Sequence, residues 1–322
     1  MRRTLVTGAA GMVGSHLLER LDSAAPGVSL GTYFRPTVRL EELAGRFALA
    51  ELDVRDRVAV RDMIARERPA TIYHLAAQSL PTVSWTDPWE TMRTNVEGTI
   101  NVFEAVREIR AQADPGYDPV VVVACSSAQY GASLTPENVP IAEETLQQPL
   151  HPYGVSKVAQ DGLAFQYWQN DRIRSIRARI FNTTGPRKRA DVVSDFAMRV
   201  ARIARQGGVL RVGNLETRRA IMDVRDLISA LMLLAEHGAP GEAYNICADR
   251  AWRIGDLIPL FEKLAGIGLT VEPDPALFRP SDEPVILGRN SKLKERTGWQ
   301  PTVELEDTLR AVLEYEMAHP DP

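Results

Sequence analysis

Cysteine is nearly absent from this sequence. Only Cys125 and Cys247 occur among its 322 residues, and each lies inside an apolar, strand-like run. Two thiols cannot build a disulfide framework or a multi-cysteine metal site, so we expect both to be small core residues. The sequence therefore predicts no metal centre.

Excess charge and long apolar runs are absent too. The 38 basic and 42 acidic residues leave a formal net charge of -4, which gives no reason to expect nucleic acid or a membrane surface as a partner. No apolar run approaches the roughly 20 residues that span a bilayer. The glycines of TLVTGAAGMVG also arrive too early for the apolar segment of a signal peptide. We therefore expect a cytoplasmic protein.

The first half of the sequence alternates short apolar strands with amphipathic helices. The expected strands cover residues 4–8, 28–34, 47–54, 71–77, 120–127 and 176–182. The expected helices between them include residues 12–21, 58–68 and 94–110. Near-continuous apolar strands alternating with helices are typical of a parallel sheet covered on both faces. With right-handed crossovers, this pattern predicts an α/β protein with a doubly wound Rossmann sheet.

The pattern changes after residue 182. A long helix is expected over residues 192–206, and the strand-like EAYNIC at 242–247 returns the chain to the main sheet. We therefore predict two interleaved lobes. Residues 1–181 and about 221–248 form the dinucleotide-binding lobe, and residues 182–220 and 249–322 form a smaller substrate-binding lobe.

The first strand runs into TGAAGMVG, which opens a helix. In such a loop the first glycine allows a tight turn, the second lets the backbone approach a pyrophosphate, and the third lets helix and strand pack closely. The positive helix N-terminus then holds the pyrophosphate. The cofactor-binding residues expected here are Gly8, Ala10, Gly11, Met12, Val13 and Gly14.

The residues after the second strand indicate which dinucleotide is bound. An NAD-specific site places an acidic residue about 20 residues after the last glycine, on the ribose 2′-hydroxyl. Here GTYFRPTVR offers Arg35 and Arg39 and no acid. A guanidinium suits the 2′-phosphate of NADP. Arg35 therefore favours NADP, with NAD still possible and a plain surface arginine as the alternative.

Two further strand ends border the expected cofactor path. Asp53 and Val54 end the third strand and are placed to flank the adenine. HLAAQ at 74–78 ends the fourth strand, where we favour a structural or cofactor-lining role for His74 over a catalytic one. The other residues of this segment are expected to line the cofactor or, for the last of them, the substrate: Leu75, Ala76, Ala77 and Gln78.

YGVSK places Tyr153 and Lys157 four residues apart, on one face of a helix. A lysine one turn from a phenol favours the phenolate, so we expect the pKa of Tyr153 to lie below its usual value near 10. Such a tyrosine can transfer a proton to or from an oxygen while hydride moves at the attached carbon. The pair follows CSSAQYG, in which two serines stand at the end of the fifth strand.

TGAAGMVG, HLAAQ, TNVEGT, SSAQYG and YGVSK occur in the order typical of the extended short-chain dehydrogenase/reductase family, which this chain resembles over nearly its full length. The resemblance implies a catalytic triad of Ser126, Tyr153 and Lys157, with Ser126 bonding the reacting oxygen and Lys157 also holding the nicotinamide ribose. It implies a cofactor-side role for Asn95 of TNVEGT. It also implies a nucleotide-sugar substrate.

The second half carries RIFNTTGPRKR, LRVGNLETRRAIMDVRD, FRPSDEP and LKERTGWQP. These segments resemble the branch of that family that contains GDP-mannose 4,6-dehydratase and GDP-4-keto-6-deoxy-mannose reductase. The resemblance implies that the substrate, above all its diphosphate, is bound by Asn182, Val193, Arg219, Arg279 and Asp282, the last replacing a glutamate. Plain surface salt bridges are the alternative for the arginines.

The segment after the fifth strand separates the chemistries of this branch. Relatives that dehydrate carry a glutamate where this chain has Ala128, and a methyl group cannot transfer a proton. Epimerases of the fucose-synthase type carry a cysteine there and a histidine at the position of Arg187. Reduction of a ketone needs neither group, so we predict an NADPH-dependent 4-ketoreductase of a GDP-4-keto-6-deoxyhexose. Ser127, Ala128 and Gln129 are expected substrate contacts, although a structural hydrogen bond explains Gln129 equally well.

Three alternatives stay open. A nucleotide-sugar 4-epimerase with retained NAD comes next, followed by a 4,6-dehydratase and by a cofactor-sensing or scaffold protein without catalysis. By analogy with relatives that pair the helices at 90–110 and 153–170 in a four-helix interface, we also expect a homodimer.

Overall fold

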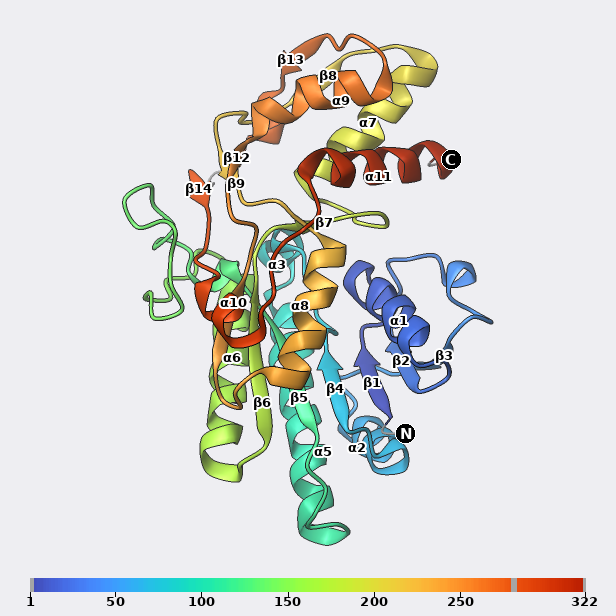
Figure 1. The fold of residues 1–322 in the computed structure, drawn as a ribbon, viewed down its shortest axis with the longest axis vertical. Coiled ribbons are helices and arrows are strands. Elements are labelled where there is room, and N and C mark those ends of the chain that lie inside the picture. The colour runs from blue at the N-terminus through green and yellow to red at the C-terminus, as the bar shows by residue number, and fades with distance from the viewer. Residues whose placement is uncertain (1–2, 279–282, 321–322) are drawn as a thin grey trace.

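The computed structural model describes residues 3–278 and 283–320 (Figure 1). Its centre is a seven-stranded parallel sheet with the order β11-β6-β5-β4-β1-β2-β3. The strands are β1 (Thr4–Thr7), β2 (Ser29–Tyr33), β3 (Ala48–Glu51), β4 (Thr71–His74), β5 (Val120–Ser126), β6 (Arg174–Ile180) and β11 (Ala243–Ile246). Because the strand order reverses between β1 and β4, the sheet is doubly wound, which confirms the predicted Rossmann fold.

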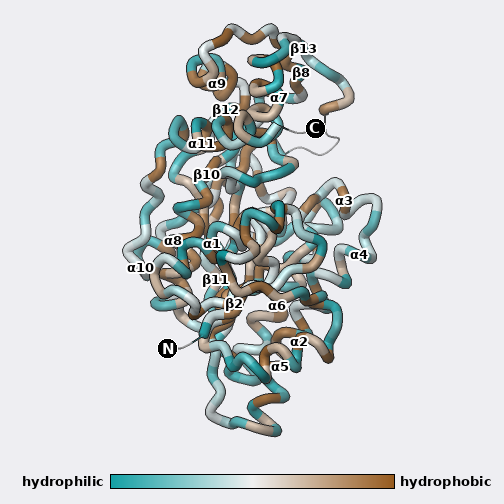
Figure 2. Tube along the Cα trace, turned by 90° about the vertical axis from the view of Figure 1, so that its right-hand side faces the viewer, coloured by the Kyte–Doolittle hydropathy of each residue, from teal (hydrophilic) through white to brown (hydrophobic). Residues whose placement is uncertain are grey.

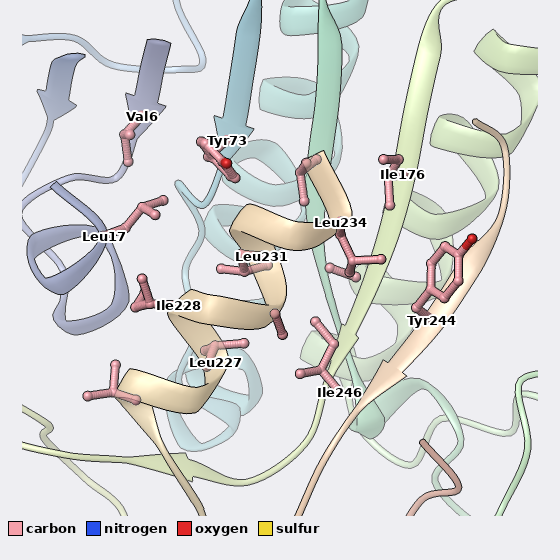
Figure 3. Close-up of a cluster of buried hydrophobic side chains, with 14 of the residues drawn as sticks. Val6, Leu17, Tyr73, Ile176, Leu227, Ile228, Leu231, Leu234, Tyr244 and Ile246 are labelled. Atoms are coloured by element: carbon pink, nitrogen blue, oxygen red, sulfur yellow. The ribbon is translucent and has the colours of Figure 1, made fainter. Parts of the chain in front are cut away.

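Helices cover both faces of the sheet. One face packs against α1 (Met12–Ala24), α8 (Val224–His237) and α10 (Ser291–Thr297), and the other against α2 (Arg57–Glu67), α5 (Gly98–Gln112) and α6 (Pro152–Asp171). Side chains of β5 alternate between the two cores, with Val122 in the first and Val121 in the second. Figure 3 shows Leu227, Leu231 and Leu234 of α8 lying over the strands in the first core.

A second lobe lies beyond the carboxyl ends of the strands (Figure 1). Its core is formed by α7 (Val192–Gln206), α9 (Leu257–Ala265) and α11 (Leu305–Ala318), as apolar faces of three helices close on one another. Short sheets border it: β8 (Leu210–Val212) with β13 (Val271–Pro273), and β9 (Arg218–Arg219) between β12 (Trp252–Arg253) and β14 (Val285–Ile286). In the rotated view, α7, α9, β8 and β13 gather at the end opposite α2 and α5 (Figure 2).

The remaining elements are short segments that connect the longer helices and strands. They are η1 (Leu40–Glu42), α3 (Pro81–Thr86), α4 (Pro88–Met92), the π-helical turn η2 (Arg93–Glu97), η3 (Ser127–Gln129), β7 (Thr183–Thr184), β10 (Met222–Asp223), η4 (Ile254–Asp256) and η5 (Pro275–Leu277). No helix of the described residues is long and apolar enough to cross a membrane.

One part of the predicted lobe division differs from the structure. Helix α10 falls within residues 249–322, which were assigned to the substrate-binding lobe, but Leu293 and Trp299 are buried in the core beneath α8. The Trp299 indole donates hydrogen bonds to the Asp226 carbonyl and to Ser229 Oγ, both at 3.0 Å. This segment therefore belongs to the Rossmann lobe, because its apolar side chains are buried there.

Candidate active site

The glycine loop joins β1 to α1. Gly8 has a φ of +71°, and a Cβ on it would lie 2.8 Å from Ala76 Cα. A Cβ on Gly14 would lie 2.3 Å from the Gly8 carbonyl oxygen, so helix and strand approach too closely for any side chain. Gly11 is the N-cap of α1, without a side-chain cap or an acidic residue in the first turn. The free amides at this N-terminus suit an anionic diphosphate.

Asn95 and Gln78 hold each other in place rather than facing a ligand. The Asn95 side chain is fully buried; it accepts from the Gln78 amide and donates to the Gln78 carbonyl and to Ser156 Oγ. The Gln78 side-chain amide donates to Leu80 O and Thr91 Oγ1, and its oxygen accepts from Leu80 N. These bonds leave neither side chain a free donor for a ligand, in contrast to the contacts expected from the sequence.

His74 is structural, as favoured from the sequence. Its Nδ1 lies 3.0 Å from Thr7 Oγ1 and its Nε2 lies 3.1 Å from Thr99 Oγ1. The Thr99 hydroxyl donates to the Asn95 carbonyl, so His74 Nε2 must carry the proton that it shares with Thr99. Thr7 then donates to His74 Nδ1 while accepting from the Ala76 amide. A proton on Nδ1 as well would end the hydrogen bond that the Thr7 hydroxyl donates to the ring.

Burial lowers the pKa of His74 to about 3, and the nearby Lys157 charge acts in the same direction. Because the unfolded chain takes up the proton near pH 6.5 and the folded chain does not, this residue should cost stability as the pH falls below 6.5. Between pH 7 and 5, the free energy of unfolding should fall by about 2 kcal/mol more in the parent protein than in His74→Gln. Urea titrations at the two pH values measure this difference. An equal fall in the free energy of unfolding in both proteins would refute the assignment.

The predicted triad is assembled at the end of β5 and the start of α6. Lys157 Nζ donates a 2.7 Å hydrogen bond to the Ala124 carbonyl and lies 5.6 Å from the centre of the Tyr153 ring. Burial lowers the pKa of Lys157 to about 8. Burial also raises the pKa of Tyr153 to about 12, although a hydrogen bond with Ser126 acts in the opposite direction.

The expected depression of the Tyr153 pKa is therefore wrong. Desolvation of the phenolate outweighs any help from Lys157, so the phenol carries its proton at neutral pH. This state suits a proton donor.

The turn η3 fixes Ser126. Its Oγ accepts from the Ala128 amide at 3.2 Å, and its own amide donates to Gln129 Oε1 at 3.3 Å. Gln129 Nε2 donates to Asp161 Oδ2 of α6, at 3.2 Å. Gln129 is fully buried and both ends of its side-chain amide are bonded. Of the two alternatives left open for it, the structural hydrogen bond is therefore the one that forms, and the substrate contact does not. Ser127 is also largely buried, while Ala128 keeps partial exposure.

A buried charged cluster, missed from the sequence, lies beneath this turn. Asp161 accepts from Arg177 Nη1 at 2.7 Å and from Arg179 Nε at 2.8 Å. Arg179 also donates to the Tyr130 hydroxyl, which donates to Asn245 Oδ1. Burial alone would raise the pKa of Asp161, but hydrogen bonds and charge from Arg179 hold it below its ordinary value. Both arginines lie in strand β6. Charged residues among the apolar residues of a buried strand were the feature of the sequence that could have indicated this cluster.

The structure places the expected substrate contacts of the second lobe in different surroundings. Asn182 Oδ1 is buried and, among the described residues, has no hydrogen-bond partner, as expected of a side chain whose partner is a ligand. Arg219 is nearly buried and donates to the carbonyls of Arg218 and Glu283. Val193 is buried in the helical core, so it supports the lobe and does not face the substrate. Arg279 and Asp282 lie outside the described residues.

The residues expected to contact the adenosine all have partners within the protein, and those of Arg35 and Asp53 are charged. Arg35 has an exposed side chain and pairs with Glu90 of α4. Asp53 accepts hydrogen bonds from Arg55, which hold the pKa of that carboxyl below its ordinary value. The Val54 carbonyl accepts from Asn101. Arg55 also donates to Glu90, so Arg35, Arg55 and the two acids form one group of charges.

The sequence pattern of the GDP-mannose 4,6-dehydratase family matches residues 5–312. This chain belongs to that family. The GDP-6-deoxy-D-mannose reductase of Pseudomonas aeruginosa is 31% identical to it over 315 residues, which cover 97% of this chain and 96% of the relative. Family membership confirms the resemblance and the expectation of an NAD(P)-dependent oxidoreductase acting on nucleotide sugars.

Solved structures of the same architecture agree. RMD from Pseudomonas aeruginosa complexed with NADPH has a TM-score of 0.84 at 29% identity and covers 99% of both chains. The Thermus thermophilus UDP-glucose 4-epimerase in complex with NAD has a TM-score of 0.87 at 26% identity, covering 98% of this chain and 99% of the neighbour. The extended Rossmann architecture is thus shared with members that differ in chemistry.

Arg187, at the position where some relatives of the family carry a histidine, is bound to the Rossmann lobe. Its Nη2 donates to Glu19 at 2.7 Å and its Nε donates to Glu42 at 3.0 Å. Its remaining nitrogen lies 3.3 Å from Ser15 Oγ of α1. Both acids raise the pKa of this guanidinium against the effect of burial, so Arg187 offers no proton and instead joins the two lobes.

Proposed function

We propose that this chain reduces the C4 ketone of a GDP-linked 4-keto-6-deoxyhexose with NADPH, giving a product of the GDP-rhamnose type. One observation carries the proposal: the Ser126–Tyr153 pair and Lys157 are assembled at the strand edge, yet the turn between them holds only the methyl group of Ala128. Dehydration at this position needs a carboxylate, and ketone reduction does not. The name of the Pseudomonas aeruginosa relative, a GDP-6-deoxy-D-mannose reductase, agrees with this class of reaction.

The residues of the chain have distinct roles in this reaction. NADPH, when bound, supplies the hydride. Tyr153, protonated at neutral pH because burial raises its pKa to about 12, gives its proton to the C4 oxygen. Ser126 Oγ hydrogen-bonds the same oxygen. Lys157, with a pKa near 8, is mostly cationic below that pH and stabilises the tyrosinate that remains.

The residues present also fit a dinucleotide. The N-terminus of α1 is free of acidic side chains, and the Gly8 and Gly14 backbones leave no room for a Cβ, as a loop pressed against its sheet requires. Arg35 after β2 supports NADPH over NADH. The neighbouring RMD structure is complexed with NADPH. A homodimer through the helices at 90–110 and 153–170 stays a prediction.

Incubation with NADPH and GDP-4-keto-6-deoxy-D-mannose tests the proposal. NADPH absorbance should fall in step with formation of a C4 hydroxyl, followed by NMR of the sugar product. The matched UDP-linked 4-keto sugar should react at least about tenfold more slowly, because groups that hydrogen-bond guanine would be left unpaired by uracil. Consumption of GDP-mannose, or interconversion of UDP-glucose and UDP-galactose without added reductant, would instead establish the dehydratase or the epimerase.

A further inference from the structure

Two arginines from neighbouring strand ends converge on one glutamate. Arg35 follows β2 and Arg55 follows β3, and these strands pair through Tyr33 and Glu51. Arg35 Nη1 lies 3.1 Å from Glu90 Oε1, and Arg55 Nη1 lies 2.6 Å from Glu90 Oε2. Both guanidinium groups also lie over the Phe34 ring, with their carbons 5.2 and 5.3 Å from its centre. We call Arg35, Arg55, Glu90 and Asp53 the arginine cluster.

The members of the arginine cluster differ in freedom. Arg55 is held from two sides: its Nε and Nη2 donate to the Asp53 carboxylate and its Nη1 to Glu90, and its side chain is 16% exposed. The Arg35 side chain is 69% exposed and forms an ion pair with Glu90. Arg55 is therefore a fixed donor, whereas Arg35 can change rotamer at little cost.

The charges of the arginine cluster cancel. Arg55 and Asp53 each shift the other's pKa towards the charged form, so both are ionised at neutral pH. Two guanidinium groups and two carboxylates sum to zero. The residues directly after β2, up to Arg39, include no acid, but the fold brings two acids to this place, Asp53 after β3 and Glu90 from α4. A 2′-phosphate therefore meets arginines that already have an anionic partner.

We infer that Glu90 sets the discrimination between NADP and NAD, and that Arg55 is the second guanidinium of the 2′-phosphate site. The Glu90 carboxylate occupies the donors of both arginines that a phosphate would use. The phosphate must displace this carboxylate or share the donors with it, which lowers its affinity without affecting a 2′-hydroxyl. This inference rests on the proposed use of NADPH and identifies the residues that tune it.

Glu90→Gln tests the inference directly, because the amide keeps the shape of the side chain and removes its charge. The probes are 2′,5′-ADP and 5′-AMP, which differ only in the 2′-phosphate, with affinities measured by calorimetric titration at low salt. The ratio of 2′,5′-ADP to 5′-AMP affinity should rise about five- to tenfold, as expected for removing one competing charge from a charge-assisted phosphate site. Glu108→Gln, which removes an equal charge from a pair with Arg57, should leave the ratio unchanged.

Arg55→Leu tests the second part of the inference, that Arg55 binds the 2′-phosphate. It should lower the affinity for 2′,5′-ADP at least about tenfold and leave that for 5′-AMP within about twofold, because only the phosphate contact is lost. An unchanged ratio in Glu90→Gln overturns the inference, even if Arg55→Leu does not fold. Since the probes carry neither nicotinamide nor sugar, a shifted ratio supports the inference even where no 4-keto sugar is reduced.

Discussion

Tyr153→Phe is expected to lower kcat for reduction of the 4-keto sugar by about 100- to 10,000-fold, the range in which a positioned proton donor contributes. The phenol lies between Ser126 and Lys157, and its raised pKa keeps the proton available at neutral pH. Without the hydroxyl, the alkoxide that forms at C4 must take its proton from water. The ring remains, so affinities for NADPH and for GDP should stay within about twofold of the parent protein.

Single-turnover absorbance and calorimetric titration measure the two quantities separately. Tyr117→Phe is the matched control, because its hydroxyl is also buried but donates to the Pro69 carbonyl at the opposite end of the sheet. It should retain full activity. If Tyr153→Phe kept kcat within tenfold of the parent, the tyrosine would not be the proton donor. If it lost both kcat and cofactor affinity, its role would be structural.

The sequence predicted the parts of this molecule that depend on local pattern. Strands β1, β4 and β5 were identified because buried parallel strands are nearly continuous apolar runs. The four-residue spacing of Tyr153 and Lys157 placed both on one helix face. The glycine loop was identified for a similar reason, since Gly8 and Gly14 occupy positions that no other residue fits.

What the sequence could not predict depends on contacts between distant segments. For Gln129 the sequence left a substrate contact and a structural hydrogen bond equally open, because its partner Asp161 lies 32 residues later in the chain. Arg35 appeared to stand without an acid because Glu90 is 55 residues away in the chain. The pKa of Tyr153 was misjudged because spacing reports the neighbouring charge but not desolvation, which is the larger effect. In each case burial or a long-range partner determined the outcome.

Asp161→Ala is expected to have the largest effect on stability. The carboxylate is the shared acceptor for Gln129, Arg177 and Arg179, and the side chains of Asp161 and Arg179 are each only 4% exposed. Removing it leaves a buried guanidinium without its counter-ion, which costs about 3–5 kcal/mol. Urea unfolding should show this loss, whereas Asp118→Ala, which breaks half-exposed pairs with Arg110 and Arg174, should cost less than about 1 kcal/mol.

Asp161→Asn separates charge from shape in the same cluster. The amide keeps one acceptor oxygen but loses the charge that Arg179 requires, so its cost should lie between those of the alanine variant and the surface control. Because Gln129 joins Asp161 to the Ser126 amide, both variants should also lower kcat more than they change the affinity for GDP. A cost below 1 kcal/mol for Asp161→Ala would show that water or a rearranged side chain neutralises Arg179.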